Sequence, residues 1–180
     1  SWLGAGVVGT ETGNPNSLYV PDPASRTEEA LYTFTKNLSC VVEYAEKMGV
    51  VVAIEPVCRH IVYDARRARQ VLRSIQSPNL QIILDPVNLL DDCDAGRYKD
   101  VVKEAIELLG EDVAVIHVKD FSVSDGKIVS MAAGTGIMDY SDLIRFMKAD
   151  KPYIHATLED TVPENAVQAR EFMERLWDEA

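Results

Sequence analysis

Four apolar runs in the chain each end on a side chain that can act as an acid, a base or a metal ligand. Consecutive large apolar residues bounded by turn formers are typical of buried strands with both faces covered. Proline follows the carboxylate of the first two runs and marks a strand exit, because it has no N–H to continue a ladder. The runs occupy residues 50–55, 80–85, 113–117 and 153–159, and they end on Glu55, Asp85, His117 and Glu159.

Amphipathic segments separate these runs. Ser25 with Glu28 fits a capping box for a first helix, and Asp64 fits the N-cap of a second. A further strand near residues 4–13 precedes the first helix, and residues 122–139 are expected to form a long loop. Apolar side chains recur at helical spacing over residues 25–48, 64–75, 95–109, 141–149 and 161–177. The alternation predicts an α/β fold, with a parallel sheet covered by helices.

Length and composition are those of a single globular domain. A chain of 180 residues, 47% apolar and 26% charged, is long enough to bury a sizeable core. The sequence contains neither an interdomain linker nor a low-complexity segment, so we expect one domain over residues 1–180.

Charge and cysteine content narrow the partners and the compartment. A net charge of −11 disfavours nucleic acids and anionic membranes, because both require a basic face. No run approaches the ~18 apolar residues of a membrane span, and the N-terminus lacks the basic region of a signal peptide. The three cysteines are scattered and form no C-x-x-C motif. We therefore expect a cytoplasmic protein with reduced thiols, no nucleic-acid partner and no membrane partner.

Polar residues at the carboxyl ends of parallel strands are found in both open doubly wound sheets and (β/α) barrels. The open sheet would need a glycine-rich phosphate loop. Residues 4–9 match G-x-G-x-x-G, but they lie within the predicted strand and a proline-rich loop follows. Four strand ends that donate ligands to one point suit a (β/α)8 TIM barrel better, because barrel strands converge around one axis.

The number of elements falls short of a closed barrel. We predict five strands and five helices, whereas a closed barrel needs eight of each in ~250 residues. The expected fold is therefore a partial TIM barrel of about five βα units. Three explanations stay open: three N-terminal units are missing, the sheet stays open, or two copies associate to cover the edges.

The motifs at the strand ends resemble a known family. Glu55-Pro-Val, Asp85-Pro-Val-Asn-Leu-Leu, His117-Val-Lys-Asp and Leu-Glu159, in this order, are similar to the xylose isomerase-like TIM barrel superfamily, and most similar to its sugar phosphate isomerase/epimerase branch. The similarity spans essentially the whole chain, over the family's strands four to eight. It implies that Glu55, Asp85, His117 and Glu159 bind one divalent metal. In the family's ketose epimerases the two metal-bound glutamates also exchange the substrate proton, which implies catalytic roles for Glu55 and Glu159.

The sequence departs from the sugar-epimerase pattern at three positions. Asn88 stands where those enzymes usually carry a histidine, three residues after the aspartate. Ile61 replaces a second glutamate, and Val123 replaces an arginine that follows the metal histidine. These differences concern the substrate and leave the four metal-ligand positions intact.

Three carboxylates and one imidazole form an oxygen-rich site. Such a donor set suits Mn²⁺, Mg²⁺ or Co²⁺, with Zn²⁺ also compatible. A bound ion would polarise the carbonyl of a hydroxy-ketone and stabilise the enediolate that forms on proton removal. Two carboxylates on opposite sides of the substrate can remove one proton and return another. The chemistry predicts an isomerase or epimerase acting on a small sugar or polyol.

Five further residues are site candidates, and four of them have a structural alternative. Lys119 could neutralise the enediolate as a catalytic residue, or it could form a salt bridge with a neighbouring carboxylate. Arg59 and His60 could bind substrate or anchor a loop. Glu11 could line the pocket or support a ligand, and Asn88 is a further substrate-binding candidate.

Other functions remain to be weighed against an isomerase. An inosose-type dehydratase needs the same metal and base, so the sequence does not separate these reactions. A repair nuclease such as endonuclease IV, from the same superfamily, needs more histidines than the three present here, His60, His117 and His155. The last alternative is a catalytically impaired barrel fragment that self-associates. Whichever of these functions holds, we expect a homo-oligomer.

Overall fold

A five-stranded parallel sheet organises the protein, as seen in a computed structural model that describes residues 3–18 and 20–180. Its strand order is β1-β2-β3-β4-β7, and every neighbouring pair is parallel. The strands are β1 (Val7–Glu11), β2 (Val51–Glu55), β3 (Leu80–Leu84), β4 (Val113–Val118) and β7 (His155–Leu158). All five lie within or close to the predicted segments, and their carboxyl ends meet at one edge of the sheet.

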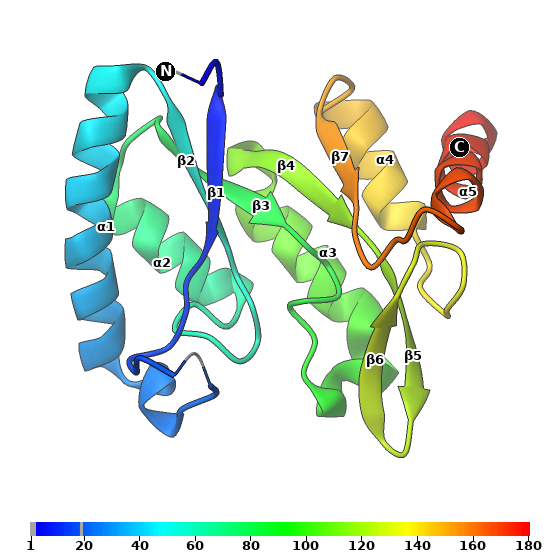
Figure 1. The fold of residues 1–180 in the computed structure, drawn as a ribbon, viewed down its shortest axis with the longest axis horizontal. Helices are drawn as coiled ribbons and strands as arrows, with labels where there is room; N and C mark the ends of the chain where they lie inside the picture. Colours follow the sequence, from blue (N-terminus) through cyan, green and yellow to red (C-terminus); the bar gives the residue numbers. More distant parts are fainter. Residues whose placement is uncertain (1–2, 19) are drawn as a thin grey trace.

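The helices form one layer against this sheet (Figure 1). Each helix contacts the next along the chain, while α1, α2 and α5 also contact β2, β3 and β7 respectively. The helices are α1 (Glu28–Met48), α2 (Ala65–Ile75), α3 (Tyr98–Leu109), α4 (Ser141–Asp150) and α5 (Ala166–Glu179). The sheet curls into a half-barrel with about five βα units, which confirms the predicted partial TIM barrel.

The core lies between the sheet and the helix layer. Ile54, Ile82, Leu84 and Ile116 are fully buried there and come from three adjacent strands. Burying each such side chain contributes about 1.5–3 kcal/mol. Because alternate strand residues point to opposite faces, this packing also directs Glu55 and His117 to the other, concave face.

The start of α1 differs from the prediction. Thr27, not Ser25, caps the helix, and its Oγ1 accepts a hydrogen bond from Ala30 N at 3.1 Å. Ser25 lies in a preceding 3₁₀ turn (Pro23–Arg26) that begins on a proline and delays the α-helix. Asp64 does cap α2, because its Oδ1 accepts from Arg67 N at 2.7 Å.

Residues 120–131 contain a β-hairpin where a loop was expected. Strand β5 (Asp120–Ser124) pairs antiparallel with β6 (Lys127–Met131), as Figure 1 shows beside the end of the main sheet. Asp125 and Gly126 both have positive φ, 51° and 73°. An Asp-Gly pair between alternating apolar residues is a strong hairpin signal, and the expectation of a loop overlooked it.

Both edges of the main sheet are open. All five residues of β1 are exposed, as are His155, Ala156 and Thr157 of β7. A groove of ≈720 Å³ runs between β1 and α1, and Val8, Phe34 and Val41 are among its lining residues. Because the five strands do not close into a barrel, the outer strands β1 and β7 each leave one edge unpaired among the described residues.

In residues 3–18 and 20–180, no helix has the length and apolar character needed to cross a membrane.

Candidate metal centre

Four side chains from four strand ends converge on one point. Each of Glu55, Asp85, His117 and Glu159 offers an oxygen or nitrogen atom, and these atoms all lie within 4.8 Å of one another. Glu55 ends β2, Asp85 follows β3, His117 lies in β4 and Glu159 follows β7. Parallel strands bring their carboxyl ends to the same edge of a sheet, which explains how residues far apart in sequence meet.

Two buried polar atoms face this point and contact charged side chains of the same cluster. They are Asp85 Oδ2 and His117 Nδ1, and Asp85 is 0% exposed. His117 Nδ1 lies 2.9 Å from Glu159 Oε1, 3.4 Å from Glu55 Oε2 and 3.9 Å from Asp85 Oδ2. Three carboxylates around one lysine and one histidine place an excess of negative charge in a partly buried site, and a cation shared by the four side chains would balance it. The donor set therefore fits a divalent metal.

In each of the three carboxylates, one oxygen accepts a hydrogen bond from a neighbouring residue and the other faces the centre. Glu55 Oε1 accepts a hydrogen bond from Asn88 Nδ2 at 2.6 Å. Asp85 Oδ1 accepts from two backbone N–H groups, those of Val87 at 2.9 Å and Asn88 at 3.0 Å. Glu159 Oε2 accepts from Lys119 Nζ at 3.0 Å. Each carboxylate thus presents one oxygen to the centre.

Lys119 forms the ion pairs that were its structural alternative. Its Nζ lies 2.8 Å from Asp85 Oδ2 and 3.0 Å from Glu159 Oε2, and the residue is buried. Its backbone carbonyl accepts a hydrogen bond from Tyr140 Oη at 2.8 Å. The side chain therefore contacts two of the four candidate ligands and lies at the centre itself.

Burial and charge shift the pKa values of the cluster. Burial raises the pKa of Asp85 to about 6, although the Lys119 ammonium opposes that shift. For Glu55 burial also acts upward, but hydrogen bonds from His117 and Asn88 together leave its pKa lowered. Burial acts downward on His117, and hydrogen bonding and charge from Glu55 and the charge of Glu159 leave its pKa raised. These opposing shifts reflect charged groups packed in a partly dry site.

The other predicted site residues lie around the centre in different roles. Glu11 is the parallel neighbour of Glu55 in the sheet, and its Oε2 lies 3.6 Å from His60 Nδ1. Arg59 pairs with Asp92 at 3.4 Å, which is the loop-anchoring alternative. Asn88, predicted to bind substrate, donates a hydrogen bond to Glu55.

Two contacts of the centre were absent from the sequence prediction. One is the bond from Asn88 to Glu55, and the other is the support of Lys119 by Tyr140. The first joins residues 33 apart. The sequence signals only the turn that carries Asn88, because an aspartate before a turn commonly accepts bonds from backbone N–H groups two and three residues on. The second joins residues 21 apart and depends on the path of the hairpin, so no local pattern indicates it.

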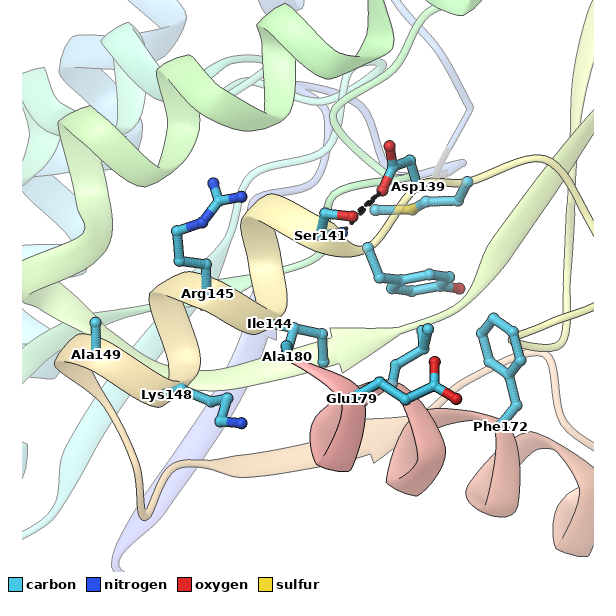
Figure 2. Close-up of a pocket in the computed structure, with 12 residues that line it drawn as sticks. Asp139, Ser141, Ile144, Arg145, Lys148, Ala149, Phe172, Glu179 and Ala180 are labelled. Carbon is cyan, nitrogen blue, oxygen red and sulfur yellow. Dashed lines mark hydrogen bonds between the residues drawn. The ribbon is translucent and has the colours of Figure 1, made fainter.

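A second cavity lies elsewhere in the molecule. This cavity has a volume of ≈670 Å³ and lies between α4 and α5. Figure 2 shows Ser141, Lys148 and Phe172 among the residues that line it. Ser141 Oγ donates a hydrogen bond to Asp139 Oδ1 at 2.6 Å at its rim. None of the four candidate ligands lines this cavity, so it is separate from the centre.

The family model for the xylose isomerase-like TIM barrel matches residues 1–176. The chain belongs to this family. No curated protein matches it. The strand-end residues that pointed to the family are the same four that converge in the structure.

The solved structures with a similar fold are longer than this chain. A D-tagatose 3-epimerase-like protein is 19% identical, with a TM-score of 0.73 over 96% of this chain and 62% of its own. The probable 3-DHS dehydratase AsbF from Bacillus anthracis is 14% identical, with a TM-score of 0.70 over 96% and 64%. The IOLI protein with a bound zinc atom is 18% identical, with a TM-score of 0.68 over 98% and 64%. These likenesses show the fold, and the chain spans less than two thirds of each structure.

Proposed function

We propose that the chain carries the metal centre of a divalent-metal-dependent isomerase or epimerase, which acts on a sugar or polyol through an enediolate. The observation that supports this most is the convergence of Glu55, Asp85, His117 and Glu159, with one oxygen of each carboxylate directed to a common point. The family and the likeness to an epimerase-like structure support the reaction class.

In this proposal the four converging side chains hold the ion, which is Mn²⁺, Mg²⁺, Co²⁺ or Zn²⁺. The oxygen-rich donor set favours the first three, and the likeness to a zinc-bound structure supports the last. When bound, the ion supplies Lewis-acid polarisation of the substrate carbonyl.

The two glutamates move the substrate proton. One of Glu55 and Glu159 takes the proton from the carbon next to the carbonyl. The C–H electron pair forms the C=C bond of the enediolate, and the π pair of the carbonyl moves to its oxygen. The other returns a proton to carbon and restores the carbonyl. Strands β3 and β4 separate the two glutamates in the sheet, which allows them to approach a substrate from different sides. The Lys119 ammonium stabilises the negative charge that develops beside it.

The matched variants Glu159→Gln and His117→Ala test the metal centre. Both remove a ligand, so we expect metal content after purification to fall by about tenfold or more relative to the unmodified protein. Exchange of substrate hydrogen for deuterium in D₂O, followed by NMR over a panel of ketoses and ketopolyols, should fall in parallel. Unchanged metal retention in both variants would contradict the proposed centre.

A dehydratase is the second candidate, supported by the likeness to AsbF. Removal of water from an inosose-type substrate begins with the same proton abstraction by a carboxylate. The product distinguishes the two reactions, because dehydration gives a conjugated enone with ultraviolet absorbance whereas epimerisation gives none. A catalytically impaired fragment that self-associates would show metal binding with neither product.

We also propose that residues 1–180 form one partial-barrel domain of a cytoplasmic homo-oligomer. The three free cysteines support the compartment, and the open edges of β1 and β7 support self-association. The net charge of −11 supports a small-molecule substrate over a nucleic acid.

A further inference from the structure

We propose that Asn88 and Lys119 select the metal by holding the outer oxygens of its carboxylate ligands, so that small octahedral ions bind and Ca²⁺ is disfavoured. We call these two residues the carboxylate clamp. The inference rests on the proposed metal centre and adds to it the class of ion that the centre accepts.

The clamp ties the three carboxylates into one chain of contacts. Asn88 donates from its side chain to Glu55 Oε1 at 2.6 Å and from its backbone to Asp85 Oδ1 at 3.0 Å. Lys119 Nζ lies 3.0 Å from Glu159 Oε2, the outer oxygen of that ligand, and also 2.8 Å from Asp85 Oδ2, which faces the centre. Two residues therefore reach all three acidic ligands.

Both clamp residues are themselves fixed by their backbones. The carbonyl of Asn88 accepts a hydrogen bond from Cys58 N at 2.8 Å, which joins the loops that follow β2 and β3. The carbonyl of Lys119 accepts from Tyr140 Oη at 2.8 Å, and both of these residues are buried. The donors thus stay in place when a carboxylate is pulled toward an ion.

A held outer oxygen prevents two-oxygen binding. For a carboxylate to chelate with both oxygens, the one bonded to the clamp must leave its donor and turn toward the ion. At Asp85 this would leave the buried N–H group of Val87 without a partner, and at Glu55 it would release the part-buried side-chain amide of Asn88, which is unfavourable in both cases. The clamp therefore keeps each carboxylate to one contact, and the chain supplies four ligand atoms in all.

Four ligand atoms suit one class of ion. Mg²⁺ and similarly sized ions prefer octahedral geometry and keep the remaining positions for water or substrate oxygens. Ca²⁺ takes about six to eight oxygen ligands and commonly uses carboxylates that bind through both oxygens. A site that allows one oxygen from each carboxylate, and that includes an imidazole nitrogen, disfavours Ca²⁺.

The test compares Mn²⁺ and Ca²⁺ binding in metal-free protein by isothermal titration calorimetry, with Mn²⁺ electron paramagnetic resonance as a second readout. Asn88→Leu removes the side-chain donor at similar volume, and Lys119→Gln removes the ammonium. We expect Asn88→Leu to bind Mn²⁺ ~10-fold more weakly and to lose less affinity for Ca²⁺. Lys119→Gln also removes a positive charge beside Asp85 Oδ2, so we expect it to gain more affinity for Ca²⁺ than for Mn²⁺. The Mn²⁺-to-Ca²⁺ affinity ratio should therefore narrow. Lys99→Met is the matched control, because Lys99 pairs with Asp139 on the surface at 2.6 Å and should leave the ratio unchanged.

The outcomes separate the clamp from the metal centre. If the unmodified protein binds neither ion, the proposed function and the clamp both fail. If it binds Mn²⁺ and both variants keep the unmodified ratio, the clamp fails while the metal centre stands. If Asn88→Leu does not fold, the Mn²⁺-to-Ca²⁺ affinity ratio of Lys119→Gln alone tests the clamp.

Discussion

Asp85 uses its two carboxylate oxygens for different purposes. Oδ1 accepts bonds from the turn of residues 86–88, as an aspartate just before a turn commonly does. Oδ2 faces Lys119 and His117 at the centre. Stabilising the turn and binding a metal are therefore compatible roles for this residue, because each needs only one oxygen.

Replacing Asp85 separates these two uses. Asp85→Asn keeps an acceptor for the turn but removes the negative charge, so we expect metal affinity to fall by ~10–100-fold with the fold retained. Asp85→Ala also removes the turn acceptor and should lower the free energy of unfolding by about 1–3 kcal/mol relative to Asp85→Asn. Calorimetric metal titration and urea unfolding measure the two effects. Equal stability of the two variants would argue against the turn role.

At the scale of elements, the segment after β4 supports the centre from outside. Buried Asp120 accepts hydrogen bonds from the backbone N–H groups of Phe121, Gly134 and Met138, and so it folds the loop after the hairpin around itself. Tyr140, at the end of that loop, bonds the Lys119 carbonyl. The loop that Asp120 stabilises therefore also positions the backbone of Lys119, through Tyr140.

Gly136 is the tightest point of this loop. A Cβ atom there would collide with the backbone carbonyl oxygen of Phe121 and with the Asp120 carboxylate, neither of which can move freely. We expect Gly136→Ala to cost about 2–4 kcal/mol of stability through overpacking and disruption of the Asp120 bonds. Gly96→Ala is the control, because a Cβ atom there meets nothing within 4 Å. Thermal unfolding of the two variants checks this, and equal midpoints would contradict it.

At the scale of the whole molecule, the half-barrel leaves two free strand edges. The edge of β1 and the edge of β7 belong to the same parallel sheet, so the edge of one copy can accept that of another in the same strand direction. Val8 of β1 lies in the ≈720 Å³ groove beside α1 and is 51% exposed. An apolar groove next to a free edge favours association.

We expect the protein to self-associate through these edges in size-exclusion chromatography with light scattering. Val8→Lys should shift it toward monomer, because a charge at the edge blocks pairing, and should change stability by less than about 1 kcal/mol at an exposed site. Val123→Lys, on the hairpin and 46% exposed, should leave the assembly unchanged. A monomer at all concentrations would contradict self-association.

The sequence by itself determined the strand–helix order, the parallel sheet and the convergence of Glu55, Asp85, His117 and Glu159. Strand ends carry this information locally, since an apolar run that ends on a polar residue places that residue at the edge of a sheet. Local signals also existed for the hairpin, in Asp125-Gly126, although the prediction overlooked them.

Only the tertiary structure decided how the four side chains are used. Which oxygen of each carboxylate faces the centre depends on donors that arrive from other strands, such as Asn88 for Glu55 and Lys119 for Glu159. Such contacts join residues 33 and 40 positions apart, and they are set by sheet register and loop path. Periodicity in the sequence specifies which face a residue takes, but not the partner that meets it there.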